Sequence, residues 1–204
     1  QNVFMLTSFN PGSGKSFLAM NIAMSFAIKK KRILVIDGDL RHGSTSSYVD
    51  SPKTGLSDYL GNRVSDWKEI IVKDEKYDNL HIIPIGTVPP NPTELLEDGK
   101  LATLIEVLRS EYDYIFIDCP PIDIVADAQI IEKLADRTVF VVRSGLLDRS
   151  MLPELENIYQ EKRFKNLSVI LNGTESAGGR YGYRYGYRNG YSSYYGNKGK
   201  MGGG

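Results

Sequence analysis

The stretch Pro11-Gly12-Ser13-Gly14-Lys15-Ser16 follows an apolar run, Val3–Thr7, and precedes a segment with helical periodicity, 16–29. Glycines in such a turn let successive backbone N–H groups point inward, and the start of the helix adds positive potential. A lysine and a serine after the turn can contact terminal phosphates and a Mg²⁺ ion. A strict G-x-x-x-x-G-K-[ST] pattern would need glycine at position 9, where this chain has Phe9. The small residues between a strand and a helix nevertheless predict a phosphate-binding loop.

Short apolar runs rich in β-branched residues alternate along the chain with helix-like segments. Several runs are apolar at almost every position, as expected for strands that helices cover on both faces. The sequence therefore predicts an α/β fold, with a doubly wound, mainly parallel sheet and helices on both of its faces. The predicted strands are Val3–Thr7, Ile33–Asp37, 80–85, Tyr114–Asp118, 138–142 and 168–171. The predicted helices are 16–29, Leu56–Leu60, 66–71, 93–109, 126–134 and 150–162.

The first predicted helix carries two apolar stripes. One stripe consists of Ala19, Ala23 and Ala27, the other consists of larger side chains, and almost nothing polar interrupts them. This pattern predicts a buried helix. The basic run 29–32 follows it, and we interpret that run as solvated charge that complements a helix C-terminus.

Carboxylates follow two further predicted strands. Asp37 and Asp39 lie two residues apart in Ile36-Asp37-Gly38-Asp39-Leu40-Arg41, so both should face the crevice at the carboxyl edge of the sheet, where ligands of such folds bind. Asp118 ends the run Ile115-Phe116-Ile117-Asp118-Cys119-Pro120-Pro121. Each motif alone has a plainer interpretation as turn chemistry or a cap. Phosphate or metal ligands from separate strands at one edge together predict a nucleotide site.

Charge and composition change near residue 175. The whole chain has 25 basic and 25 acidic residues, but 20 basic and 25 acidic residues lie within 1–175, and five basic and no acidic residues lie within 176–204. Ten of the 20 glycines and seven of the 13 tyrosines also fall within 176–204. Such a composition lacks the aliphatic side chains of a core. We predict one domain over 1–175 and a flexible Gly/Tyr/Arg tail over 176–204.

Several protein classes are excluded. The single Cys119 excludes a disulfide-stapled module, and we interpret it as a small buried side chain. No run approaches the ~18 apolar residues of a membrane-spanning helix, and no signal peptide precedes the first strand. Because a strand begins almost directly after Gln1, we expect the chain to be a piece of a longer protein.

With these motifs in view, the chain resembles the bacterial tyrosine kinases, which build a protein kinase on a P-loop fold. Residues 11–16 resemble the Walker A motif of that family, 36–41 its extra D-x-D-x-R motif, and 117–121 its Walker B motif. The segment 86–96 resembles its G-x-x-P-P-N-P-S-E-L-L pattern, and the tyrosine-rich tail resembles its autophosphorylation cluster. The resemblance spans nearly the whole chain.

The resemblance implies a site that binds ATP and Mg²⁺. Asn172 would contact adenine, and ATP is favoured over GTP because Glu175 stands where a guanine-reading N-x-x-D motif has aspartate. Asp37 would accept the proton of the tyrosine, whose phenol has a pKa near ~10. The implied nucleotide contacts are Gly12, Ser13, Gly14, Lys15, Ser16, Phe17 and Asn172; the implied metal ligands are Ser16, Asp39 and Asp118; and the implied catalytic residues are Lys15, Asp37, Asp39, Arg41 and Asp118.

The resemblance also implies a substrate and partners. The enzyme would phosphorylate its own tail between protomers of a homo-oligomer, a ring in the family. It would act with a tyrosine phosphatase and with proteins of capsular or exopolysaccharide export. It would be the cytoplasmic domain of an inner-membrane protein. The implied phosphorylation sites are Tyr181, Tyr183, Tyr185, Tyr187, Tyr191, Tyr194 and Tyr195.

Two departures from the family pattern concern regulation and assembly. Some members carry an internal tyrosine just after the D-x-D-x-R motif, where this chain has Ser44, and the nearest tyrosine is Tyr48. The family's Glu/Arg-rich docking helix would precede Gln1. These departures put control by an internal tyrosine, and the strength of assembly of this chain, in question.

Two functions other than a kinase fit parts of the sequence. A nucleotide-switch ATPase of the partition or cell-division type has the same fold, but such proteins carry a second lysine where this chain has Asn10. A nucleic-acid-binding module could use the Arg/Tyr/Gly tail, because tyrosine stacks on bases and arginine contacts phosphates. Five cations in that tail are few for this role, so nucleic acid is an unlikely partner.

Overall fold

The computed structural model describes residues 1–122 and 126–174 and is built around a seven-stranded sheet with the order β3-β4-β2-β5-β1-β6-β7. Neighbouring strands are parallel except β3 and β4. From β1 the chain crosses to β2, β3 and β4 on one side and later to β6 and β7 on the other, with β5 inserted between β1 and β2, which is the doubly wound arrangement that the sequence predicts. The strands are β1 Val3–Thr7, β2 Ile33–Asp37, β3 Val72–Lys73, β4 Leu80–Ile83, β5 Tyr114–Asp118, β6 Arg137–Arg143 and β7 Leu167–Asn172.

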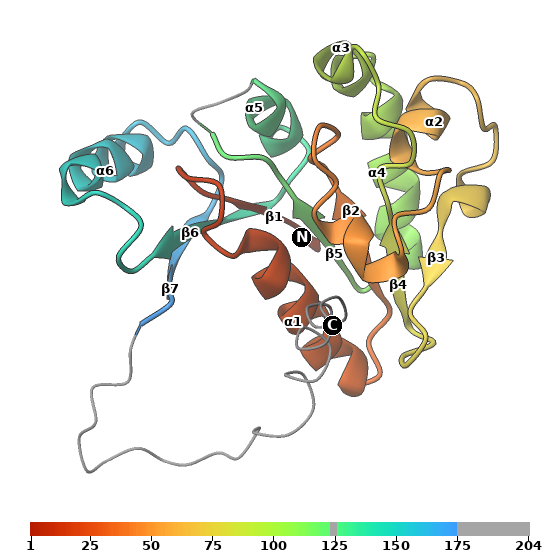
Figure 1. The fold of residues 1–204 in the computed structure, drawn as a ribbon, viewed down its shortest axis with the longest axis horizontal. Helices are drawn as coiled ribbons and strands as arrows, with labels where there is room; N and C mark the ends of the chain where they lie inside the picture. Colours follow the sequence, from red (N-terminus) through yellow and green to blue (C-terminus); the bar gives the residue numbers. More distant parts are fainter. Residues whose placement is uncertain (123–125, 175–204) are drawn as a thin grey trace, which may run out of the picture. The chain divides into compact units, whose positions relative to one another are not determined.

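Helices cover both faces of this sheet (Figure 1). One buried cluster joins α1 to one face, and a larger cluster joins side chains of α2 to α6 to the other face. The α-helices are α1 Lys15–Ile28, α2 Leu56–Leu60, α3 Pro92–Glu97, α4 Lys100–Glu111, α5 Asp127–Glu132 and α6 Leu152–Gln160. The 3₁₀ helices are η1 Thr45–Val49, η2 Trp67–Ile70 and η3 Arg149–Met151.

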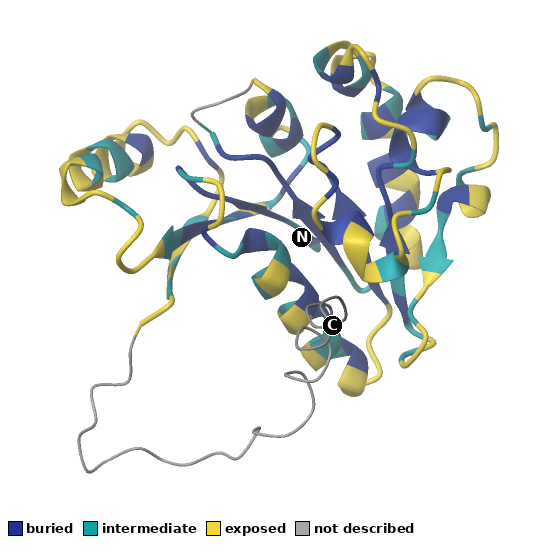
Figure 2. Ribbon diagram, in the orientation of Figure 1, coloured by how far each residue is buried: buried dark blue, intermediate teal, exposed yellow. Residues whose placement is uncertain are grey.

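Helix α1 packs against the sheet through both of its apolar stripes. Ala19, Ala23 and Ala27 are buried, and the larger side chains of the second stripe are partly buried against the same core cluster. Phe17 and Ile28 are 58% and 57% exposed, and Figure 2 shows exposed positions along the outer side of α1. The prediction of a buried helix is therefore confirmed for the two stripes, while the outer side of α1 is exposed.

The predicted strands are confirmed, with small changes at their ends. β1, β2 and β5 have the predicted bounds, and β4 ends at Ile83 rather than at residue 85. Pro84 follows Ile83 and has no N–H to continue the ladder. β3 escaped prediction because a strand of two residues, Val72–Lys73, has no measurable periodicity.

The predicted helix 93–109 is wrong as a single element. Gly99 adopts a left-handed φ of 80° and separates α3 from α4, so the chain changes direction between them. The predicted helix 66–71 is the 3₁₀ helix η2. Trp67 on η2 packs against the larger core cluster.

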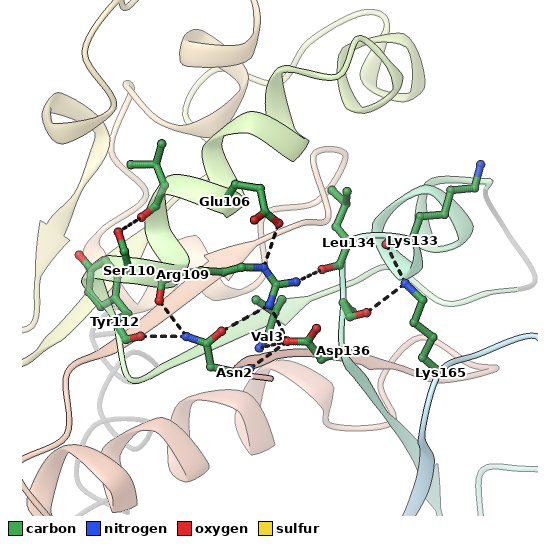
Figure 3. A network of polar contacts seen from close by, with 12 residues as sticks. Asn2, Val3, Glu106, Arg109, Ser110, Tyr112, Lys133, Leu134, Asp136 and Lys165 are labelled. Atoms are coloured by element: carbon green, nitrogen blue, oxygen red, sulfur yellow. Dashed lines mark hydrogen bonds and ion pairs between the residues drawn. The ribbon is translucent and has the colours of Figure 1, made fainter.

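A polar network fixes the chain where it enters β1, at the amino edge of the sheet (Figure 3). The Asp136 carboxylate accepts hydrogen bonds from the backbone N–H groups of Asn2 and Val3, at 2.8 and 3.0 Å, and from Nη1 of Arg109 at 2.6 Å. The Asn2 side chain in turn donates to the carbonyl oxygens of Arg109 and Tyr112. The start of β1 is thereby tied to the end of α4 and to the turn before β6.

The predicted tail and its seven tyrosines, within 176–204, lie outside the described residues. Within 1–122 and 126–174, no helix combines the length and the apolar character needed to cross a membrane.

Candidate nucleotide-binding and catalytic site

The phosphate-binding loop joins β1 to α1 and depends on two glycines. Gly12 and Gly14 have left-handed φ values of 74° and 94°, which other residues rarely adopt. A Cβ atom on Gly14 would also lie 2.3 Å from Nδ2 of Asn172. Phe9, which replaces the first glycine of the strict pattern, is buried and packs edge-on against Phe140 at a centroid distance of 4.8 Å. Phe9 therefore anchors the loop in the core.

Lys15 lies in the loop close to the carboxylates predicted to share its site. Its Nζ donates to Oγ of Ser8 at 3.2 Å, and only 9% of the residue is exposed. Burial lowers the pKa of Lys15, and the nearby charges of Asp118 and Asp39 oppose that shift. The ammonium group is thus held within the field of two carboxylates, and an incoming phosphate would find it already positioned.

Asp118, at the end of β5, is tied to both the P-loop and the segment after β2. Oγ1 of Thr45 donates to Oδ2 of Asp118 at 2.6 Å, and the hydroxyl of Ser16 lies near enough to lower the pKa of this carboxyl. Burial raises the pKa of Asp118, while these hydrogen bonds and Lys15 lower it. Oδ1 is buried and has no hydrogen-bond partner among the described residues. The structure brings Lys15, Ser16 and Asp118 together, as the motifs predict.

Asp37, at the end of β2, lies beside Asp118 in the sheet and is fully buried. Its Oδ2 accepts hydrogen bonds from the backbone N–H and the hydroxyl of Ser46, both at 2.7 Å, while Oδ1 has no partner among the described residues. Burial raises the pKa of Asp37 to about 7, against the hydrogen bonds from Ser46. A carboxylate with such a pKa can exchange a proton near neutral pH.

Asp39 lies nearer the surface than Asp37. Its Oδ1 accepts the backbone N–H groups of Arg41 and His42, at 3.2 and 3.3 Å, and Nδ1 of His42 lies 3.2 Å from Oδ2. The segment after β2 therefore folds around Asp39. The charge of Asp39 also acts on Lys15 and Asp118, so all three groups share one site.

The side chain of Arg41 pairs with a different carboxylate, at the start of α5. Its Nε lies 3.2 Å from Oδ2 of Asp127, and its Nη2 donates to Oγ1 of Thr93 at 3.0 Å. The family resemblance implies that Arg41 is a catalytic residue. Its two partners could not be predicted, because Thr93 and Asp127 lie at the starts of helices that are distant from Arg41 in the sequence.

Asn172, at the end of β7, contacts the phosphate-binding loop itself. Its Nδ2 donates to the carbonyl oxygen of Ser13 at 2.9 Å, and Nη1 of Arg143, at the end of β6, donates to that of Gly12 at 2.7 Å. The carboxyl ends of β6 and β7 thus both contact the loop. The predicted contact of Asn172 with adenine stays a prediction, and Phe17 lies exposed on the first turn of α1.

The oxygen atoms at this edge fit a Mg²⁺ ion bound together with phosphates. No group of three or more His, Cys, Asp or Glu side chains within the described part of the chain could hold a metal. Protein Mg²⁺ sites usually take one or two carboxylates and complete the octahedron with phosphates and water. The unpaired Oδ1 of Asp118 and the adjacent hydroxyl of Ser16 match that pattern. A metal here would need oxygens from a bound nucleotide.

Three residues missed by sequence reasoning complete the site. Thr45 and Ser46, on η1, hold Asp118 and Asp37 respectively, and Ser8 holds Lys15. A hydroxyl after a loop carries no sequence signal of this kind. Cys119 is buried, and burial places its thiol pKa well above the ordinary value, so its plain interpretation as a packing residue is confirmed.

Known proteins are similar in sequence to this chain over most of its length. A model of the AAA domain family matches residues 2–168. Tyrosine-protein kinase CpsD of Streptococcus pneumoniae is 35% identical over 200 residues, which cover 97% of this chain and 84% of CpsD. The chain belongs to the bacterial tyrosine kinases. Tyrosine-protein kinase YwqD of Bacillus subtilis is also 35% identical to this tyrosine kinase, over 88% of the chain and 76% of YwqD.

Solved structures of bacterial tyrosine kinases have the same fold as this chain. The kinase domain of the Escherichia coli tyrosine kinase ETK superposes on this tyrosine kinase with a TM-score of 0.79 and 32% identity, over 91% of this chain and 72% of ETK's. The septum site-determining protein MinD of Pyrococcus horikoshii, complexed with Mg-ADP, has a TM-score of 0.68 and 21% identity, over 83% and 69% of the two chains. That second likeness shows a shared P-loop fold alone.

The geometry explains how this tyrosine kinase can bind a nucleotide and transfer a phosphoryl group to a tyrosine. The glycine loop presents backbone N–H groups, and Lys15 adds a buried positive charge. The carboxylates of Asp37 and Asp118 are neighbours across β2 and β5. The groups expected to bind phosphate and a carboxylate with a raised pKa therefore lie at one edge of the sheet.

Proposed function

We propose that this tyrosine kinase transfers the γ-phosphoryl group of ATP, with Mg²⁺, to the seven tyrosines within 176–204 of a second copy of the same chain. The observation that carries the proposal is the meeting of Lys15, Ser16, Asp39 and Asp118 at one edge of the sheet, next to the buried Asp37. Each of these residues has a role in such a transfer, and the roles can be tested separately.

Binding of ATP is assigned to the phosphate-binding loop. The N–H groups of residues 12–17 and Nζ of Lys15 would contact the phosphates, and Asn172 would lie against the adenine. Ser16, Asp39 and Asp118 would hold the Mg²⁺ ion, which when bound neutralises the charge of the phosphates and of the leaving diphosphate. The choice of ATP over GTP rests on Glu175, which replaces the aspartate of a guanine-reading motif.

We assign Asp37 as the group that accepts the proton of the tyrosine hydroxyl. A bond forms between the tyrosine oxygen and the γ-phosphorus, the bond from that phosphorus to the bridging oxygen breaks, and the phenol proton passes to Asp37. Burial of Asp37 supports this role, because it raises the pKa to about 7. Ser46 occupies Oδ2 of Asp37, so Oδ1, which has no partner among the described residues, is the oxygen assigned to accept the proton.

The tail is assigned as acceptor on the basis of composition and charge. It contains seven tyrosines and five basic residues, while residues 1–175 carry an excess of five acidic residues. Opposite charges would bring the tail of one protomer to the domain of another. The family resemblance further suggests regulation of capsular or exopolysaccharide synthesis, a counteracting phosphatase, and attachment at the inner membrane.

The decisive experiment is incubation of the full chain with Mg·ATP, followed by mass spectrometry of the tail. We expect phosphate on several tail tyrosines of the unmutated protein and none on the Lys15→Met variant. Nucleotide hydrolysis without tyrosine phosphate would instead favour a switch ATPase. Salt-sensitive RNA binding by the tail, again without phosphorylation, would favour a nucleic-acid-binding module.

A further inference from the structure

Three polar side chains from distant parts of the sequence meet beside the site. Arg41 follows β2, Thr93 lies in the first turn of α3, and Asp127 begins α5. Nε of Arg41 lies 3.2 Å from Oδ2 of Asp127, Nη2 of Arg41 donates to Oγ1 of Thr93 at 3.0 Å, and Oγ1 of Thr93 donates to Oδ1 of Asp127 at 2.6 Å. The three form a closed triangle, in which both oxygens of Asp127 are used.

The residues of this triangle differ in how far they are buried. The Asp127 side chain is fully buried, whereas the Arg41 side chain is 36% exposed. A buried carboxylate needs a cation and hydrogen bonds, and Arg41 and Thr93 supply them. A guanidinium has five N–H groups. Among the described residues two of these bind Thr93 and Asp127, so the other three remain available to a ligand.

The backbone of Arg41 lies beside one of the carboxylates of the site. The N–H of Arg41 donates to Oδ1 of Asp39 at 3.2 Å, so the residue that carries the guanidinium also contacts an expected metal ligand. α3 and α5 fix the far end of the same side chain. A planar guanidinium fixed at two of its nitrogens presents its remaining donors in a defined direction, which suits the oxygens of a phosphoryl group.

We propose that Thr93 and Asp127 are positioning residues, which hold the guanidinium of Arg41 so that its remaining N–H groups bind the phosphoryl group during transfer. This inference rests on the proposed transfer at this edge of the sheet. Arg41 is the residue that touches the reacting group, and Thr93 and Asp127 act only through Arg41. Electrostatic stabilisation of this kind lowers the barrier only if the donors are in place before the reaction.

The Thr93 hydroxyl gives the sharpest test, because it accepts from Arg41 and donates to Asp127 at once. Thr93→Val keeps the shape of the side chain and removes both hydrogen bonds. Thr103→Val is the matched control: Thr103 lies on α4, and its hydroxyl contacts only the carbonyl oxygen of Gly99, at 3.3 Å. Asp127→Asn is the second variant, and it removes the charge that faces Arg41.

We expect Thr93→Val to lower kcat by about tenfold and Asp127→Asn by up to about 10²-fold, since a small misplacement of a positioned group can cost that much. The Kd for ATP, measured by fluorescence without turnover, should stay close to that of Thr103→Val, whereas the Tm should fall because Oδ1 of the buried Asp127 loses its hydrogen bond. In the Arg41→Gln background, Thr93→Val should have no further effect on kcat, because residues that act as a unit are not additive. Arg41→Lys should restore little, since lysine has no fixed fork.

Two results would overturn the inference. One is a further tenfold fall in kcat when Thr93→Val is added to Arg41→Gln. The other is a fall in kcat for Thr93→Val that is matched by an equal weakening of ATP binding, as a purely structural contact would give. All rates are measured with the full chain and a synthetic tyrosine peptide as acceptor. The inference can therefore fail while tail phosphorylation persists, and it can hold even if the tail is not the acceptor.

Discussion

Asp37 combines full burial with a carboxylate oxygen that lacks a partner among the described residues. If it accepts the tyrosine proton, Asp37→Asn should lower kcat by about 10²- to 10⁴-fold, the usual contribution of a general base. The affinity for Mg·ATP should change little, because Asp37 is not among the expected metal ligands. The measurement is kcat with a tyrosine peptide together with nucleotide Kd by titration.

Asp39→Asn serves as the contrasting variant at the same edge. It should weaken nucleotide binding mainly in the presence of Mg²⁺, because it removes one expected carboxylate ligand. If Asp37→Asn and Asp39→Asn had the same effect on Mg²⁺-dependent binding, the separate roles assigned to them would be wrong.

Gly14 and Gly99 provide a matched pair for the cost of a side chain in the phosphate-binding loop. Both have left-handed φ values, 94° and 80°, so alanine at either position should cost about 1 kcal/mol of backbone strain. Only at Gly14 would the new Cβ also collide with Asn172, whereas nothing lies within 4 Å at Gly99. We expect both variants to lose stability in urea unfolding, and only Gly14→Ala to lose ATP affinity, by at least about tenfold. Equal ATP affinity in the two variants would contradict this view of the loop.

At the residue scale, motifs predicted which side chains lie together in the site, but not the side chains that hydrogen-bond to them. Lys15, Ser16 and Asp118 could be predicted because each follows a recognisable strand or turn, and the edge of a parallel sheet brings such positions together. The hydroxyls of Thr45 and Ser46 could not, since a contact between a loop and a strand end depends on tertiary packing alone. The direction of the Arg41 side chain was missed for the same reason.

At the scale of the element, apolar runs predicted strands far better than periodicity predicted helices. β1, β2 and β5 are buried on both faces, so their composition alone marks their limits. The break between α3 and α4 was missed because glycine is tolerated inside a helical pattern, and only its left-handed φ ends the helix. Exposure of one side of α1 depends on what lies outside it, which its own sequence does not encode.

The anchor of β1 gives a prediction about pH. Burial raises the pKa of Asp136, but the hydrogen bonds from Arg109 and from the N–H of Val3 outweigh it and lower that pKa to about 2. A carboxylate whose folded pKa lies below its ordinary value stabilises the fold above about pH 4 and loses this effect as the pH falls towards 2. Asp136→Asn should therefore cost about 2 kcal/mol at pH 7 and much less near pH 2, by urea unfolding.

The control for this anchor is Asp113→Asn. Asp113 also accepts a backbone N–H and pairs with an arginine, Arg32, but the pair is exposed and its ions are 3.6 Å apart. Its loss should cost less than that of Asp136 at pH 7. A loss from Asp136→Asn that did not depend on pH would mean that packing, rather than charge, accounts for the anchor.

For the whole molecule, charge predicts how assembly responds to the proposed reaction. The tail carries five positive charges, and residues 1–175 carry a net charge of −5. Each phosphotyrosine adds about −1.5 to −2, so modification of all seven tyrosines would make the tail negative. We expect assemblies of the full chain to become smaller at low salt after full phosphorylation, as measured by analytical ultracentrifugation.

The matched control is a variant with phenylalanine at all seven tail tyrosines, which keeps the basic residues. Incubated with Mg·ATP, it should keep its original assembly size, and added salt should dissociate it because exposed charges are screened. An assembly of unchanged size after complete phosphorylation of the unmutated protein would refute the electrostatic account.

The polar network around Asn2 lies at the opposite edge of the sheet from the chemistry. β1 separates the two edges by five residues, or about 17 Å of extended chain. A fluorophore or a surface linker joined ahead of Asn2 would thus sit well away from the nucleotide while sharing the rigidity of the clamped strand. A fluorophore there could report energy transfer between copies of the chain without touching the nucleotide site. A surface linker there would leave the carboxyl edge of the sheet facing solution.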